Sequence, residues 1–154
     1  MPETPSGVKV ISTLVILSAS WLTYLTISNE QPWLAQAVGF GFLIVSFVLF
    51  WVTIRETSNA RLLAAFDEKL PHGLLKTGPY AYVRHPFYTS YLIQWIGWAI
   101  AAWSIWAIVP VVLMFATYWN AARDEEAKFA KTDMSDEYRA FTETTGRFFP
   151  KLFG

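Results

Sequence analysis

Residues 86–122 read PFYTSYLIQWIGWAIAAWSIWAIVPVVLMFATYWNAA and contain no charged side chain in 37 positions. A helix of that length would extend about 55 Å at 1.5 Å per residue, whereas the hydrocarbon core of a bilayer is only about 30 Å thick. A single upright membrane span therefore cannot contain this stretch. We expect two membrane helices, residues 86–102 and 104–122, which form a hairpin with its turn near residues 101–104.

Two more hydrophobic stretches precede the hairpin. Residues 10–28 and 33–54 are each close to the ~20 residues that cross a bilayer as a helix. The whole chain is 54% hydrophobic and only 16% charged, against roughly 25% charged residues in soluble domains. The sequence thus predicts an all-α, polytopic membrane helical bundle with four transmembrane helices in a single membrane domain, residues 1–154.

The basic residues indicate how this bundle is oriented. Of the twelve Lys and Arg residues, Lys9 precedes the first span, five lie between the second and third spans, and six follow residue 122. Because basic segments stay on the cytoplasmic side, the chain must cross the membrane an even number of times between Arg84 and Arg123. We therefore expect an integral multi-pass membrane protein with both its N- and C-termini in the cytoplasm.

The ionisable groups that could carry chemistry flank the predicted hairpin. Residues 78–88, GPYAYVRHPFY, come directly before it, and Glu125 and Glu126 follow it within a helical tail. A hairpin returns to the face that it leaves, so the two segments can share a site. The chain has no cysteine and only two histidines without a patterned carboxylate partner. We expect no metal site and no nucleic-acid partner.

These segments resemble a known family. The sequences GPYAYVRHPFY, EEAKF (residues 125–129), EYRAF (137–141) and RFFP (147–150) are similar, in order and approximate spacing, to the C-terminal core of the isoprenylcysteine carboxyl methyltransferases and the related phospholipid N-methyltransferases. The resemblance covers residues 70–150. It implies a membrane enzyme that binds S-adenosylmethionine, with S-adenosylhomocysteine as product, in a pocket formed by the cytoplasmic loop and the C-terminal helical tail.

The chemistry of that cofactor suggests roles for the residues. Aromatic faces suit its sulfonium, a carboxylate suits its ammonium, and a cationic or imidazole donor suits its carboxylate. We expect His85 and Glu126 to be catalytic. His85 would accept the proton that an amine or thiol must lose before it reacts. The residues expected to bind the cofactor are Gly78, Pro79, Tyr80, Tyr82, Val83, Arg84, His85, Pro86, Tyr88, Glu125 and Glu126.

The methyl acceptor is expected to be a lipid-like or hydrophobic molecule that arrives from the bilayer. A prenylcysteine carboxylate, an amine of a phospholipid headgroup and a hydrophobic thiol all remain open. Residues 142–146 read TETTG, where the prenylcysteine enzymes usually carry a basic residue, which disfavours a carboxylate acceptor. Arg147 could replace that residue, bind a lipid phosphate, or anchor the tail, and anchoring is the favoured interpretation.

Other interpretations of the same segments stay open. The sequence Arg84-His85-Pro86 is also typical of a helix start at a membrane interface, and an acidic pair is often the solvated face of a helix. Sterol reductases, which bind NADPH, have a similar C-terminal core, and a membrane scaffold could keep the fold without catalysis. Binding of S-adenosylhomocysteine, of a dinucleotide, or of neither discriminates the three functions.

Overall fold

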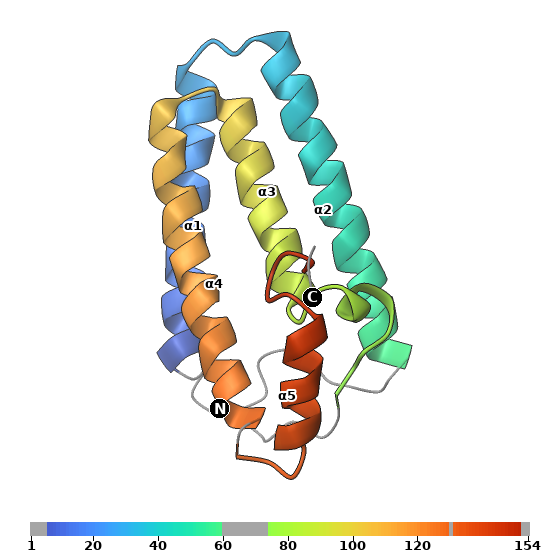
Figure 1. Cartoon of the computed structure of the whole chain (residues 1–154). Coiled ribbons are helices and arrows are strands. Elements are labelled where there is room, and N and C mark those ends of the chain that lie inside the picture. Colours follow the sequence, from blue (N-terminus) through green and yellow to red (C-terminus); the bar gives the residue numbers. More distant parts are fainter. Residues whose placement is uncertain (1–5, 60–73, 130, 152–154) are drawn as a thin grey trace. The chain divides into compact units, whose positions relative to one another are not determined.

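The computed structural model of the protein describes residues 6–59, 74–129 and 131–151, and among these residues all regular structure is helical (Figure 1). The all-α prediction is therefore confirmed. Residues 60–73 of the predicted cytoplasmic loop lie outside the described residues. In chain order the elements are α1 (Ser6–Ser28), α2 (Trp33–Asn59), η1 (Gly78–Ala81), α3 (Pro86–Ala102), η2 (Ile105–Ala107), α4 (Ile108–Phe129) and α5 (Ser135–Thr144).

Three segments of the described chain are long and apolar enough to cross a membrane, namely Val8–Ser28, Trp33–Ser58 and Ile105–Phe129. They correspond to the predicted spans at residues 10–28, 33–54 and 104–122. The remaining predicted span, residues 86–102, is helical over those residues, but with 17 residues α3 is the shortest of the four and does not belong to that group. A multi-pass membrane protein is thus supported, whereas a count of four spans is not confirmed.

The break in the long uncharged stretch falls where the sequence predicts it. Helix α3 ends at Ala102, and η2 begins at Ile105. Between them Trp103 adopts φ 48°, a left-handed conformation that ends a helix and that a bulky residue rarely takes. Helix α4 continues seven residues beyond the predicted span end at residue 122, which places Glu125 and Glu126 on helical backbone.

The chain divides into two compact units, and the first comprises Met1–Val45 and Leu92–Tyr118. Within this unit α2 and α3 approach each other closely through glycines: a Cβ added to Gly39 would lie 2.6 Å from the carbonyl oxygen of Gly97. Helix α1 contacts η2, where the indole Nε1 of Trp21 donates a 3.2 Å hydrogen bond to the carbonyl of Trp106. Glycines at the contact between α2 and α3 thus support tight helix packing in this apolar unit.

The second unit comprises Ser46–Tyr91 and Trp119–Gly154 and contains all the predicted site residues. In it the end of α2 packs on the start of α3: Ser46 Oγ donates to the carbonyl of Ser90 at 2.7 Å, and the rings of Phe50 and Phe87 meet edge-on with centroids 5.7 Å apart. The hydroxyls of Thr57 and Tyr80 lie 3.3 Å apart and connect α2 to η1. Whether residues 1–154 form a single domain stays a prediction.

Candidate functional site

The segment before α3 is shaped by a glycine and two prolines. Gly78 begins η1 with φ +56°, and a Cβ at this position would lie 3.0 Å from the side chain of Glu56, so only glycine fits without strain. Pro79 occupies the first turn of η1, where its missing N–H costs no hydrogen bond. Pro86 starts α3 and is fully buried. These residues build the turn that presents Arg84 and His85.

A C-terminal strap, defined here as residues 145–149, lies along this segment. Gly146 pairs with Val83 in a parallel bridge. The backbone N–H of Arg84 donates to the carbonyl of Gly146 at 2.8 Å, and that of His85 donates to the carbonyl of Arg147 at 3.1 Å. A Cβ on Gly146 would lie 1.6 Å from the carbonyl oxygen of Phe149. Glycine is therefore required where the strap folds back on itself.

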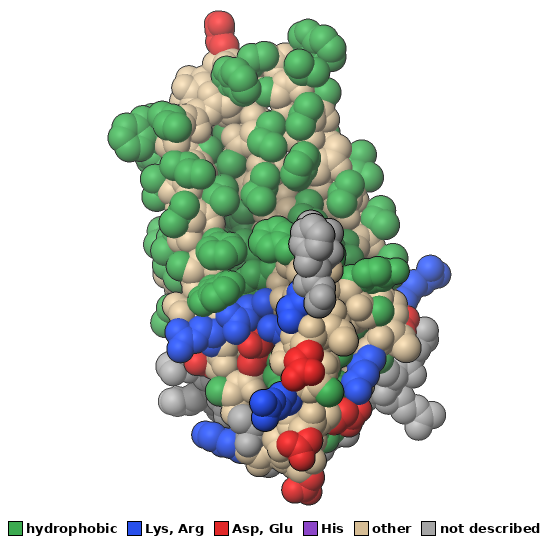
Figure 2. Space-filling model, viewed as in Figure 1, with side chains coloured by type: hydrophobic (Ala, Val, Ile, Leu, Met, Phe, Trp, Pro, Cys, Tyr) green, Lys and Arg blue, Asp and Glu red, His purple; other side chains and the backbone are tan. Residues whose placement is uncertain are grey.

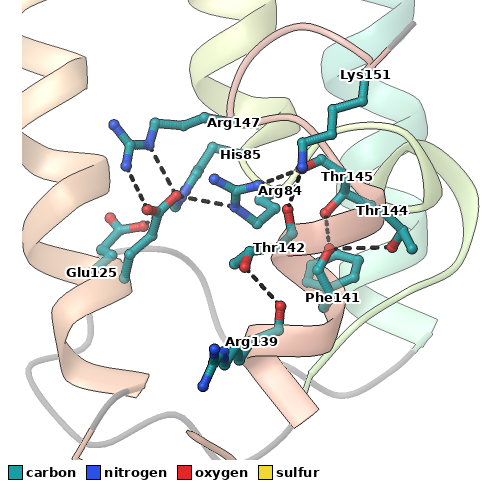
Figure 3. Close-up of polar contacts among 11 residues, drawn as sticks. Arg84, His85, Glu125, Arg139, Phe141, Thr142, Thr144, Thr145, Arg147 and Lys151 are labelled. Carbon is teal, nitrogen blue, oxygen red and sulfur yellow. Dashed lines mark hydrogen bonds and ion pairs between the residues drawn. The ribbon is translucent and has the colours of Figure 1, made fainter. Parts of the chain in front are cut away.

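Three cationic side chains converge on Glu126. The Nε atom of Arg84 donates to Oε1 at 3.1 Å, and Nε2 of His85 lies 3.1 Å from the same oxygen. Arg147 donates through Nε to Oε1 at 3.0 Å and through Nη2 to Oε2 at 2.6 Å. Figure 3 shows the side chains of Arg84, His85 and Arg147 gathered beside Glu125 near the end of α4. Glu126 thus joins three parts of the sequence.

Glu125 has a different environment from its neighbour. The hydroxyl of Tyr88 donates to its Oε1 at 2.5 Å, and Nδ1 of His85 lies 3.3 Å from its Oε2. Its side chain is 27% exposed, against 15% for Glu126. No arginine pairs with Glu125 among the described residues. Of the two carboxylates, Glu125 is therefore the one with more capacity to bind a cationic group.

His85 lies between the two carboxylates and is charged more easily than a free histidine. Burial alone lowers the pKa of His85, but the hydrogen bonds and negative charges of Glu125 and Glu126 outweigh it, and the pKa is raised above its ordinary value. The ring is 10% exposed and stacks on Tyr88 with centroids 5.6 Å apart. When protonated, both ring nitrogens donate hydrogen bonds, and neither has a free lone pair.

The tyrosines expected near the cofactor occupy distinct positions. Tyr88 is buried, and its ring contacts His85 and Phe148. The pKa of Tyr80 is raised, chiefly by burial and also by the negative charge of Glu125. Tyr82 has an exposed side chain and contributes its backbone carbonyl, which accepts from the N–H of Gly146 at 3.3 Å. Their contacts with an onium group stay a prediction.

Some residues of this cluster were not among the predicted site residues. Arg147 stacks its guanidinium 4.2 Å from the ring centroid of Trp119 and pairs with Glu126, which agrees with the anchoring interpretation. Thr145 was missed as well, and its carbonyl accepts a hydrogen bond from Arg84. Tyr138 stacks on Phe129 at 4.3 Å, and burial raises its pKa. The motifs RFFP and EYRAF were the available signal, but sequence spacing could not assign partners to them.

Among residues 6–59, 74–129 and 131–151, no three His, Cys, Asp or Glu side chains are grouped so as to hold a metal ion. The predicted core, residues 70–150, begins within a segment that is not described. His72 lies in that segment as well.

Comparison with known proteins supports the resemblance noted in the sequence. The family model described as phospholipid methyltransferase matches residues 34–134, a region that contains α2 except its first residue, α3, α4 and every predicted site residue. No curated protein and no solved structure gives a significant match. The match covers well over half of the chain, and the described helices have the lengths and composition of a multi-pass membrane protein. The chain belongs to the phospholipid methyltransferase family, and it is a membrane methyltransferase.

Proposed function

We propose that this protein transfers a methyl group from S-adenosylmethionine to the amine of a phospholipid headgroup. The observation that carries the proposal is the convergence of Arg84, His85 and Tyr88 with Glu125 and Glu126 from segments about 40 residues apart in sequence. The family match supports methyl transfer to a lipid. The similarity to isoprenylcysteine carboxyl methyltransferases supports the same fold of the core but leaves the acceptor open.

The groups in the cluster suit the charges of the cofactor. Glu125 offers a partly exposed carboxylate for an ammonium group, and the rings of Tyr80 and Tyr88 offer aromatic surface for a sulfonium. Glu126 is already neutralised by Arg84, His85 and Arg147. We therefore assign cofactor binding to Glu125 and assign to Glu126 the positioning of the groups around it. S-adenosylmethionine, when bound, supplies an electrophilic methyl group.

The protein's contribution is then to bind, to orient and to exclude water. A phospholipid amine is protonated at neutral pH and has to lose a proton before it can react. His85 can accept that proton only above its raised pKa, because the imidazolium between two carboxylates has no lone pair. A catalytic role for His85 thus predicts that the rate rises with pH through this pKa. The catalytic role that the sequence predicts for Glu126 stays a prediction.

Ligand binding by detergent-purified protein tests the proposal. Calorimetric titration with S-adenosylhomocysteine is expected to show saturable binding, whereas NADPH is expected to show none. Incubation with labelled S-adenosylmethionine and a phosphatidylethanolamine in mixed micelles should yield a labelled lipid. Binding of NADPH alone would replace the proposal by a reductase, and binding of neither ligand by folded protein would replace it by a scaffold.

A further inference from the structure

Arg123, next to the cluster on α4, has no side-chain partner among the residues that the structure describes. It is exposed on α4, and among the described residues its side chain has no hydrogen bond or ion pair. In contrast, Arg84 and Arg147 both bind Glu126, and Lys151 binds backbone carbonyls at the end of α5. An unpaired guanidinium beside a functional cluster can take an anion.

The position of Arg123 on α4 brings it close to Arg147. The guanidinium of Arg147 spans the helix surface between Trp119, at 4.2 Å, and Glu126, at 2.6 Å. At about 100° per residue, Arg123 lies about 40° around the helix from Trp119 and about 60° from Glu126. Residues three and four positions apart are neighbours on a helix. Arg123 and Arg147 therefore lie along the same exposed stripe of α4.

The charges of this stripe do not cancel. The carboxylates of Glu125 and Glu126 face three cationic side chains, namely Arg84, Arg147 and protonated His85, and Arg123 adds a fourth. Two acids flank Arg123 on α4: Asp124 lies about 100° around the helix, away from Trp119, and Glu126 lies about 60° away on the Trp119 side, where both its oxygens are occupied. Arg147 uses Nε and one Nη2 hydrogen for Glu126, so its Nη1 group can still donate to a ligand.

Arg123 and Arg147 lie at the end of the predicted membrane span, where lipid phosphates are expected. Residues 104–122 carry no charge, and Arg123 is the first charged residue after them. Arginine at the end of a membrane helix extends to the headgroup layer, and Trp119 is typical of the same interface. On the face drawn in Figure 2, several Lys and Arg side chains lie close together.

We propose that Arg123 and Arg147 bind the phosphate diester of the acceptor phospholipid. This inference rests on the proposed function, and it places the lipid headgroup on the Trp119 side of Glu126. Glu125 points about 160° around α4 from Arg123 by helix geometry, so the cofactor's ammonium and the lipid's phosphate occupy different sides of the helix. Two parallel N–H donors of a guanidinium suit phosphate oxygens.

Short-chain lipid binding tests the site independently of the cofactor. The titrants are dihexanoylphosphatidylethanolamine and, separately, S-adenosylhomocysteine, applied to wild type and Arg123→Gln. We expect the variant to weaken lipid binding about tenfold, as for the loss of one charge-assisted hydrogen bond, and to leave affinity for S-adenosylhomocysteine within twofold. Arg55→Gln is the matched control, because Arg55 is an exposed arginine at the end of another long helix, α2.

Three outcomes would overturn the inference. If Arg123→Gln lost affinity for S-adenosylhomocysteine but not for the lipid, Arg123 would bind the carboxylate of the cofactor and not the phosphate of the lipid. Equal weakening by Arg123→Gln and Arg55→Gln would reflect general surface charge, and an unchanged lipid affinity would remove Arg123 from recognition. If the wild type failed to bind S-adenosylhomocysteine but bound the lipid through Arg123, the proposed function would fail while the phosphate site stood.

Discussion

Arg147 Nη2 lies 2.6 Å from Glu126 Oε2, and this ion pair fastens the C-terminal strap to the end of α4. The strap in turn accepts backbone hydrogen bonds from Arg84 and His85. The two guanidinium bonds of Arg147 to one carboxylate fix its orientation as well as its distance. The residues before α3 thus obtain their position from a segment about 60 residues later in the sequence.

The acidic pair allows a comparison of neighbouring, isosteric substitutions. Glu125→Gln is expected to weaken S-adenosylhomocysteine binding by about tenfold or more, because a charge-assisted hydrogen bond contributes about 1.5–3 kcal/mol, with little change in melting temperature. Glu126→Gln is expected to lower the melting temperature more, since three cations lose their shared counter-charge. Calorimetry and thermal unfolding in detergent measure the two effects. If Glu126→Gln weakened S-adenosylhomocysteine binding more than Glu125→Gln did, Glu126 would be the residue that binds the ligand.

Removal of the arginine in the strap should loosen the segment before α3. Arg147→Ala leaves a mostly buried carboxylate with one fewer partner and is expected to destabilise the second unit by at most about 3 kcal/mol. The backbone amides of Arg84 and His85 should then exchange with deuterium faster, because their acceptors belong to the strap. Arg147→Lys retains the charge without the paired bonds and serves as the intermediate case. Unchanged exchange in both variants would mean that backbone bonding alone holds the strap.

Two glycines provide a matched test of backbone packing. Gly146→Ala is expected to disrupt the strap, since the new methyl group would lie 1.6 Å from the carbonyl oxygen of Phe149. Gly41→Ala adds the same methyl group in α2, where nothing lies within 4 Å, and should be neutral or stabilising by up to about 1 kcal/mol. Melting temperatures of the two variants make the comparison. Equal tolerance of both substitutions would show that the strap can adopt another path.

The raised pKa of His85 predicts a pH-dependent stability. Because the pKa is higher in the folded protein than its ordinary 6.5, the stability from protonated His85 is complete below about pH 6.5 and is lost as pH rises through the folded-state pKa. Melting temperature measured at increasing pH should therefore fall in the wild type and change less in His85→Gln. The charged or ionisable groups that face the ring are Arg84, Tyr88, Glu125 and Glu126.

The other histidine of the chain gives the control for this titration. His72→Gln removes the chain's other imidazole and should leave the wild-type pH dependence in place. The same slope in wild type and His85→Gln would assign the pH dependence to other groups. Methyl transfer measured over the same range shows, separately, whether deprotonation of His85 increases the rate.

Much of the architecture follows from local sequence properties. Apolar runs bounded by charges determine where α1, α2 and α4 lie, because only helices satisfy the backbone hydrogen bonds of a membrane span. The uncharged stretch at residues 86–122 determines that the chain must break, and Trp103 supplies the break. The motif residues also identified Arg84, His85, Tyr88 and the acidic pair as neighbours, since a hairpin brings both its ends to one face.

The division of roles within the site required the tertiary structure. Glu125 and Glu126 are adjacent and chemically identical in sequence, and only their position on α4 gives Glu126 the two arginines and leaves Glu125 with Tyr88. The position of the strap also depends on the tertiary structure, because its hydrogen bonds are made by backbone groups that every residue carries. Sequence patterns record side-chain type and spacing, whereas pairing over 20 to 60 residues depends on which surfaces pack together.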